Sequence, residues 1–130
     1  MTYITMNKHL FITLLLSLST CSFADTAHNI PFGNVSIETT RTLLNLQHPP
    51  IVIDVRTPKE FSEGHIKGAK NIDIKADDFH AQITKLDKSK TYLIHCRSGV
   101  RSAKALHFFK KLGFTNLYHM HDGFLKWKSE

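Results

Sequence analysis

The chain has 130 residues, of which 42% are hydrophobic, and a formal net charge of +6. This length suits one domain with a buried core, and the hydrophobic content is that of an ordinary globular protein. The lysines are scattered and no aromatic platform accompanies them, which argues against nucleic-acid binding. The positive charge favours small anions near the surface.

Residues 1–24 are predicted to be a secretory signal peptide. Lys8 precedes an apolar run from Leu10 to Leu18, and Ser22-Phe23-Ala24 places small residues at the two positions that a signal peptidase reads. The run is too short to span a bilayer as a transmembrane helix. We therefore expect a periplasmic protein that begins at Asp25 and is not held at the membrane after cleavage. The loss of Lys8 lowers its net charge from +6 to +5.

The leader does not decide which methionine starts the chain or whether a lipid is attached. Met1 and Met6 are both suitable start residues. The stretch Leu18-Ser19-Thr20 before Cys21 loosely resembles a lipoprotein acylation box, so a lipid anchor at Cys21 is the minor alternative. Cleavage at the predicted site would leave Cys96 as the only cysteine, and no internal disulfide would then form. An unpaired thiol in an exported protein suggests that the thiol is used.

The first half of the mature chain is predicted to form a helix, a strand and a second helix after an irregular lead-in. Ser36 and Thr57 are good N-caps, and Pro58 suits the first position of a helix. Pro49-Pro50 stops the first helix, and Gly64 ends the second. In order, these elements are the lead-in 25–35, the helix 37–46, the strand 51–55 and the helix 58–63.

The second half continues the alternation of strands and helices. Gly113 closes the longest helix, and Asp122-Gly123 turns the chain into a C-terminal helical turn that carries Trp127. In order, these elements are a strand 69–74, a helix 77–86, a strand from Tyr92 that ends at Cys96, a helix 100–112, a strand 116–120 and the C-terminal turn.

This alternation predicts an α/β fold with a mostly parallel central sheet and helices on both faces. No internal repeat, low-complexity stretch or linker follows the leader, so residues 36–130 are predicted to be a single domain. Ligands of such sheets bind at the carboxyl ends of the strands. Cys96 lies at one of those ends.

The loop from Cys96 to Arg101 carries the strongest chemical signal. It lies between a strand and a helix N-terminus, where backbone N–H groups are unpaired and the helix dipole adds partial positive charge. Arg97 and Arg101 add two full charges. We expect the thiol to ionise well below its free pKa of about 8.5 and to act as a nucleophile. An inert core cysteine is the alternative, but it does not need the Arg, Ser and Gly that follow Cys96.

Three stretches resemble the rhodanese domain. They cover roughly Ser36 to Trp127 and, among such domains, look most like small single-domain exported bacterial thiosulfate sulfurtransferases. The stretches are Asp54-Val55-Arg56-Thr57-Pro58-Lys59-Glu60-Phe61 with Gly64-His65-Ile66-Lys67-Gly68-Ala69-Lys70-Asn71-Ile72, the loop Cys96-Arg97-Ser98-Gly99-Val100-Arg101-Ser102, and Gly113-Phe114 with Asp122-Gly123 and Trp127.

The resemblance implies a sulfurtransferase with no metal or organic cofactor. The Cys96 thiolate would attack the outer sulfur of thiosulfate, sulfite would leave, and a Cys96 persulfide would pass its sulfur to cyanide, a thiol or a dithiol. The rest of the loop would bind the anionic donor through Arg97, Ser98, Gly99, Val100 and Arg101. The sequence leaves the donor and acceptor in the cell open, and also the oligomeric state.

Two other functions compete with this one. A cysteine phosphatase or an arsenate reductase uses a related loop, but phosphatases place one more residue between the cysteine and the arginine than the four that separate Cys96 from Arg101. A non-catalytic binding module or sulfur carrier is the other alternative. Such modules typically lack the cysteine.

The remaining polar candidates are interpreted as scaffold. Asp54 is expected to accept hydrogen bonds near the site, and Arg56 is spaced to pair with Glu60. His65 is interpreted as a structural residue in a turn. His95 precedes Cys96 and points to the opposite face by strand alternation, so no Cys–His dyad is expected. The remaining candidates, His107, His119 and His121, form no metal-binding spacing with Cys96.

Overall fold

The centre of the computed structural model, which describes residues 30–129, is a five-stranded sheet. Its strands are β1 (Gly33–Val35), β2 (Ile51–Asp54), β3 (Lys70–Asn71), β4 (Tyr92–His95) and β5 (Leu117–Met120). Their order is β1-β5-β4-β2-β3, and every neighbouring pair is parallel. The predicted signal peptide and Cys21 lie outside the described residues.

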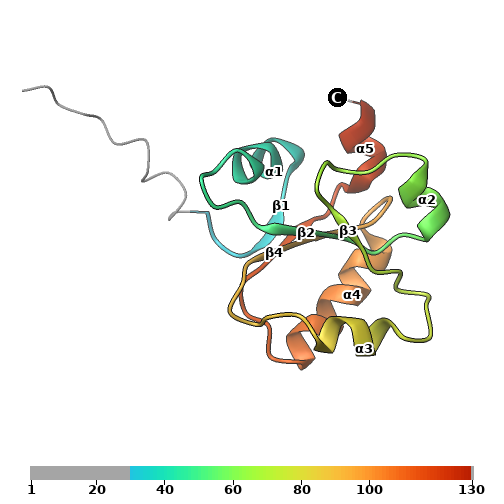
Figure 1. Ribbon diagram of the computed structural model, residues 1–130. Helices are drawn as coiled ribbons and strands as arrows, with labels where there is room; N and C mark the ends of the chain where they lie inside the picture. The colour runs from blue at the N-terminus through green and yellow to red at the C-terminus, as the bar shows by residue number, and fades with distance from the viewer. Residues whose placement is uncertain (1–29, 130) are drawn as a thin grey trace, which may run out of the picture.

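Within the described residues, five helices surround this sheet (Figure 1). They are α1 (Ile37–Leu44), α2 (Pro58–Ser62), α3 (Phe79–Thr84), α4 (Val100–Lys111) and α5 (Gly123–Ser129). The helices α3 and α4 pack on one face, and α1 and α5 pack on the other. This arrangement confirms the predicted α/β class. No helix in residues 30–129 is long and apolar enough to cross a membrane.

Side chains alternate along β4 between the two halves of the core, and this alternation also sets the direction of the side chain that follows the strand. Tyr92 and Ile94 are buried against α3 and α4, whereas Leu93 is buried against α1 and α5. Successive side chains of a strand point to opposite faces. Cys96 continues in phase with Ile94 and belongs to the same core cluster. The central strand therefore directs the cysteine toward the N-terminal end of α4.

The structure corrects the prediction for the chain's beginning. Residues 33–35, assigned to the irregular lead-in, form β1 and pair with β5 through the register Asn34 to His119. A three-residue strand that contains Gly33 has no periodicity of its own, so its pairing is set by β5 and not by local sequence. The strand β3 is also shorter than the predicted strand 69–74. Beyond its end, the Ile72 N–H still donates to the Asp54 carbonyl of β2, and the Ile74 N–H donates to the Val55 carbonyl.

Candidate active site

Cys96 directly follows β4 and is buried, with 1% of its surface exposed. Its Sγ atom accepts a hydrogen bond from the Gly99 backbone N–H at 3.1 Å and one from the Ser102 hydroxyl at 3.3 Å. Burial opposes ionisation, but these bonds and the neighbouring backbone N–H groups outweigh it, so that the pKa of Cys96 lies below its ordinary value. The direction of this shift is the one that the sequence predicts, and hydrogen bonds to the sulfur are its main cause.

Gly99 shapes the loop because only glycine fits its conformation and its surroundings. It precedes α4 with φ +93°, which turns its N–H toward the sulfur. A Cβ atom there would clash with the backbone carbonyl oxygen of His121, which follows β5. The loop and the end of β5 are therefore in backbone contact, and no side chain separates them.

The start of α5 holds the other side of the loop. The Phe124 N–H donates to the Cys96 carbonyl at 2.8 Å, and the Leu125 N–H donates to the Arg97 carbonyl at 3.0 Å. Gly123 has φ +78°, and a Cβ atom on it would clash with the Arg97 carbonyl group. Asp122, which stands before it, does not have a positive φ. The carbonyls of Cys96 and Arg97 are thus fixed from outside the loop.

Arg101 forms a two-armed ion pair with Glu60 on α2. Its Nη1 and Nη2 atoms lie 2.7 Å from Glu60 Oε2 and Oε1, respectively. Glu60 also accepts a hydrogen bond from the Thr57 N–H in a capping box. The bond from Arg101 is the main reason that the pKa of Glu60 falls to about 2. The loop is therefore braced against α2 by a charged pair at the sheet's carboxyl edge.

The predicted pairing of Arg56 with Glu60 is wrong. The Arg56 Nε and Nη2 atoms instead bind the carboxylate of Asp54, with the shortest contact 2.6 Å. The Arg56 guanidinium also donates to the Gly64 carbonyl at 2.7 Å and lies 4.1 Å from the Phe124 ring centroid. Asp54 and Arg56 are both buried, so this pair links β2 to the end of α2 and to α5. The expected scaffold role of both residues agrees with this placement.

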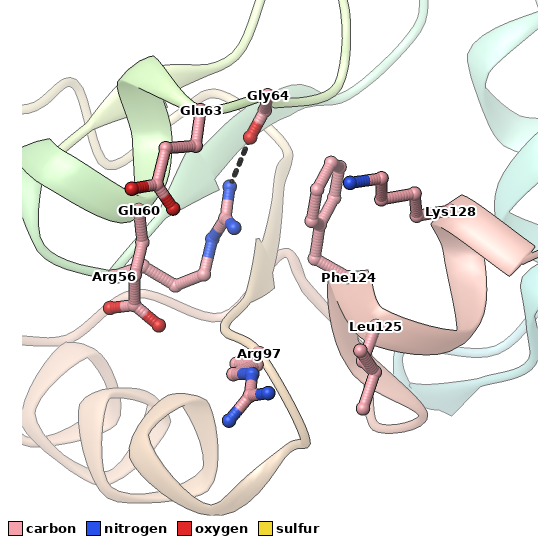
Figure 2. Close-up of a pocket in the computed structure, with 8 residues that line it drawn as sticks. All are labelled: Arg56, Glu60, Glu63, Gly64, Arg97, Phe124, Leu125 and Lys128. Atoms are coloured by element: carbon pink, nitrogen blue, oxygen red, sulfur yellow. Dashed lines mark hydrogen bonds between the residues drawn. The ribbon is translucent and has the colours of Figure 1, made fainter.

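Arg97 lies in a different environment from Arg101. It is exposed, and within residues 30–129 its guanidinium forms no side-chain hydrogen bond or ion pair. It lines an open pocket of about 210 Å³ with Lys128, Phe124 and Leu125 from α5 (Figure 2). The other lining residues are Arg56, Glu60, Glu63 and Gly64. Arg97 is therefore an exposed cation of the loop, and it lies beside this pocket.

The other predicted loop residues divide by exposure. Ser98 is exposed, Gly99 is buried, and Val100 is 76% exposed. The side chain of Val100 therefore lies outside the buried surroundings of Sγ, and the loop offers its backbone around the sulfur. Among the described residues no group of three His, Cys, Asp or Glu side chains is placed to hold a metal ion.

Two histidines lie near the loop in different ways. His95 is fully buried, and its Nδ1 atom hydrogen-bonds the Cys96 carbonyl oxygen and not the sulfur. His119 reaches the thiol indirectly, because its Nε2 atom lies 2.8 Å from the Ser102 hydroxyl. Sequence reasoning assigned no role to His119 or Ser102. The alternation of His119 with Tyr118 and Met120 was the available signal, since it places His119 on the face that carries Cys96.

The model of the rhodanese-like domain family matches residues 38–130. This chain belongs to that family. The Staphylococcus aureus rhodanese-like domain protein has a solved structure with a TM-score of 0.67 and 27% identity, covering 74% of this chain and 91% of that one. This rhodanese-like domain therefore shares its architecture with an experimentally determined relative.

Curated relatives of this rhodanese-like domain include named sulfurtransferases. Thiosulfate sulfurtransferase GlpE of Ectopseudomonas mendocina is 30% identical over 79 residues, which are 61% of this chain and 71% of that protein. MoeZ of Mycobacterium tuberculosis, named a probable adenylyltransferase/sulfurtransferase, is 37% identical over 79 residues. The match covers 61% of this chain but spans only 20% of the length of MoeZ.

The Glu60–Arg101 pair predicts a pH-dependent contribution to stability. The folded-state pKa of Glu60, about 2, lies below the ordinary value of 4.5, so ionised Glu60 stabilises the fold above about pH 4.5 and this contribution disappears as the pH falls toward 2. Glu60→Gln should lower the free energy of unfolding by about 1–2 kcal/mol at pH 7, allowing for partial exposure. Urea unfolding of both proteins at pH 7 and pH 3 measures this.

Glu63→Gln is the matched control, because Glu63 is an exposed carboxylate on the same helical turn. It should change the unfolding free energy little at either pH. A difference between wild type and Glu60→Gln that stays constant from pH 7 to pH 3 would contradict the ion-pair account.

The contact between Gly99 and His121 gives a second prediction. Gly99→Ala should lower the unfolding free energy by about 2–4 kcal/mol, because it adds a steric clash to an unfavourable φ. Gly113→Ala is the control: Gly113 also has a positive φ, but a Cβ atom there meets nothing within 4 Å. It should cost only about 1 kcal/mol. Equal losses in the two variants, measured by urea unfolding, would show that the backbone contact does not constrain the loop.

Proposed function

We propose that this rhodanese-like domain is a sulfurtransferase that takes a sulfane sulfur from thiosulfate, or a similar anionic donor, onto Cys96. The observation that carries the proposal is the Cys96 sulfur itself, buried and hydrogen-bonded by the Gly99 N–H and the Ser102 hydroxyl. These bonds favour the thiolate, so no general base has to contact the donor during the attack. The sulfurtransferase names of its relatives support this chemistry.

The first half-reaction transfers one sulfur atom. The Cys96 thiolate attacks the outer sulfur of thiosulfate, a new S–S bond forms, and the S–S bond within thiosulfate breaks. Sulfite leaves with that electron pair, and Cys96 becomes a persulfide anion. Backbone N–H groups at the start of α4 face the sulfur, where they stabilise the negative charge that the persulfide carries.

The second half-reaction returns the thiolate. A thiophilic acceptor, which is cyanide in an assay and a thiol or dithiol in the cell, attacks the outer sulfur of the persulfide. The bond to Cys96 then breaks, and the electron pair returns to Sγ. The exposed surfaces of Arg97 and Ser98 leave the loop open to a small acceptor.

The direct test is thiocyanate formation from thiosulfate and cyanide. Cys96→Ala and Cys96→Ser should lose this activity while keeping a cooperative unfolding transition, because a methyl or hydroxyl group cannot supply a thiolate. Residual activity within about tenfold of wild type, which is only about 1.4 kcal/mol of barrier, would rule out Cys96 as the carrier. Hydrolysis of a phosphate ester by the wild type, without thiocyanate formation, would favour the phosphatase alternative.

Arg97 is proposed to bind the donor. Arg97→Ala should remove a charge-assisted bond worth roughly 1–3 kcal/mol and so raise KM for thiosulfate about fivefold to 150-fold, with a smaller effect on kcat. Lys88→Ala is a charge-matched control, because exposed Lys88 precedes β4 and so belongs to the amino edge of the sheet. Saturation curves for thiosulfate measure both. If the two variants have the same KM, Arg97 does not contact the donor.

We also propose that the domain is exported and acts in the periplasm. The support is the leader pattern of Lys8, the apolar run and Ala24. N-terminal sequencing of the protein from a periplasmic fraction should begin at Asp25. A cytosolic protein that keeps Met1 or Met6 would refute export. A lipid on Cys21 would show instead that the protein is anchored to the membrane.

A further inference from the structure

The Ser102 hydroxyl stands between three acceptors. Its Oγ atom lies 3.3 Å from Cys96 Sγ, 3.0 Å from the Gly99 carbonyl oxygen and 2.8 Å from His119 Nε2. Ser102 is fully buried, so water does not supply a further partner at its surface. A serine hydroxyl has one proton to donate. Whatever controls the direction of that proton controls one of the hydrogen bonds to the thiolate.

His119 is held in one orientation by the edge of the sheet. It is 4% exposed on β5, and its Nδ1 atom lies 2.9 Å from Asn34 Oδ1 on the neighbouring strand β1. An amide oxygen only accepts hydrogen bonds, so the proton of the neutral ring sits on Nδ1. The lone pair of Nε2 then faces the Ser102 hydroxyl. The strand that sequence analysis missed therefore fixes the tautomer of this histidine.

We propose that His119 is a positioning residue that controls the ionisation of Cys96 through Ser102. The thiol proton of Cys96 passes to Ser102 Oγ as the Ser102 hydroxyl proton passes to His119 Nε2. The products are a Cys96 thiolate and a His119 imidazolium, and no proton leaves the site. Nε2–H then donates to Ser102 Oγ, and the Ser102 hydroxyl donates to the thiolate.

The surroundings of His119 make the imidazolium depend on the thiolate. Burial lowers the pKa of His119, and electrostatic interactions with His121, beyond β5, and with Lys110 on α4 lower it further. A hydrogen bond with the Gly99 backbone raises it. Cys96 is the anionic group that faces His119 through Ser102. A charged His119 is therefore favoured when Cys96 is ionised, and each ionisation promotes the other.

The test is the pH dependence of Cys96 alkylation by iodoacetamide in the full chain. Tryptic cleavage after Lys90 and Arg97 isolates Cys96 from Cys21, so mass spectrometry of peptide 91–97 reports Cys96 alone. The wild type should show two ionisations. His119→Gln should show one, with a rate at pH 6 about tenfold lower, as expected for a shift of about one pKa unit. His107→Gln, an exposed histidine of α4, should match the wild type.

A double variant separates the relay from independent effects. Ser102→Ala should also give a single ionisation, and Ser102→Ala/His119→Gln should react like Ser102→Ala alone, because the path to His119 is already cut. A His119→Gln profile that superimposes on that of the wild type would overturn the proposal. Effects of the two substitutions that simply add would overturn it as well.

A second measurement does not depend on the folding of His119→Gln. In an NMR titration of the imidazole nitrogens, His119 should have a lower pKa in Cys96→Ser than in the wild type, because coupling between two sites is reciprocal. An unchanged titration would refute the relay.

The inference rests on the proposed function only for its effect on sulfur transfer. Coupled titrations without thiocyanate formation would keep the relay and reject the sulfurtransferase. Thiocyanate formation with uncoupled titrations would keep the sulfurtransferase and reject the relay. The two failures are therefore distinguishable.

Discussion

The hydrogen bond from the Gly99 N–H to Cys96 Sγ is the interaction on which the site depends. It exists because Gly99 adopts φ +93° at the start of α4, a conformation that side chains rarely tolerate. The end of β5 leaves no room for a Cβ atom there, and the start of α5 binds the carbonyls of Cys96 and Arg97. Backbone geometry at the end of the sheet therefore holds the Cys96 sulfur in place, before any charged side chain contributes.

Charge is distributed around this loop according to burial. Arg56, which is buried, is neutralised by Asp54, and half-buried Arg101 is neutralised by Glu60. Breaking the buried Arg56–Asp54 pair would leave a charge with little solvation. Arg97 remains exposed beside the pocket. The two arginines of one short loop thus differ in environment, because Arg101 has a carboxylate opposite it.

The sequence alone predicted the features that depend on interactions between residues close together in the chain. The apolar run before Cys96, the capping residues and Gly113 were sufficient to predict the α/β alternation and the position of Cys96. Pairing between distant segments was not predictable in this way. An i,i+4 rule joined Arg56 to Glu60, whereas the fold brings Arg101 to Glu60 from 41 positions away. The strand β1 and the contact from Ser102 to His119 also depend on tertiary pairing, so they emerged only from the structure.

The central claim is that Cys96 carries sulfur as a persulfide in this buried loop. It is tested most directly by intact mass after incubation with thiosulfate, followed by mapping of peptide 91–97 under non-reducing conditions. The account predicts one added sulfur atom on Cys96, which cyanide removes completely and which is absent from Cys96→Ser. A wild-type protein that stays unmodified under conditions in which it turns over thiosulfate would contradict the account.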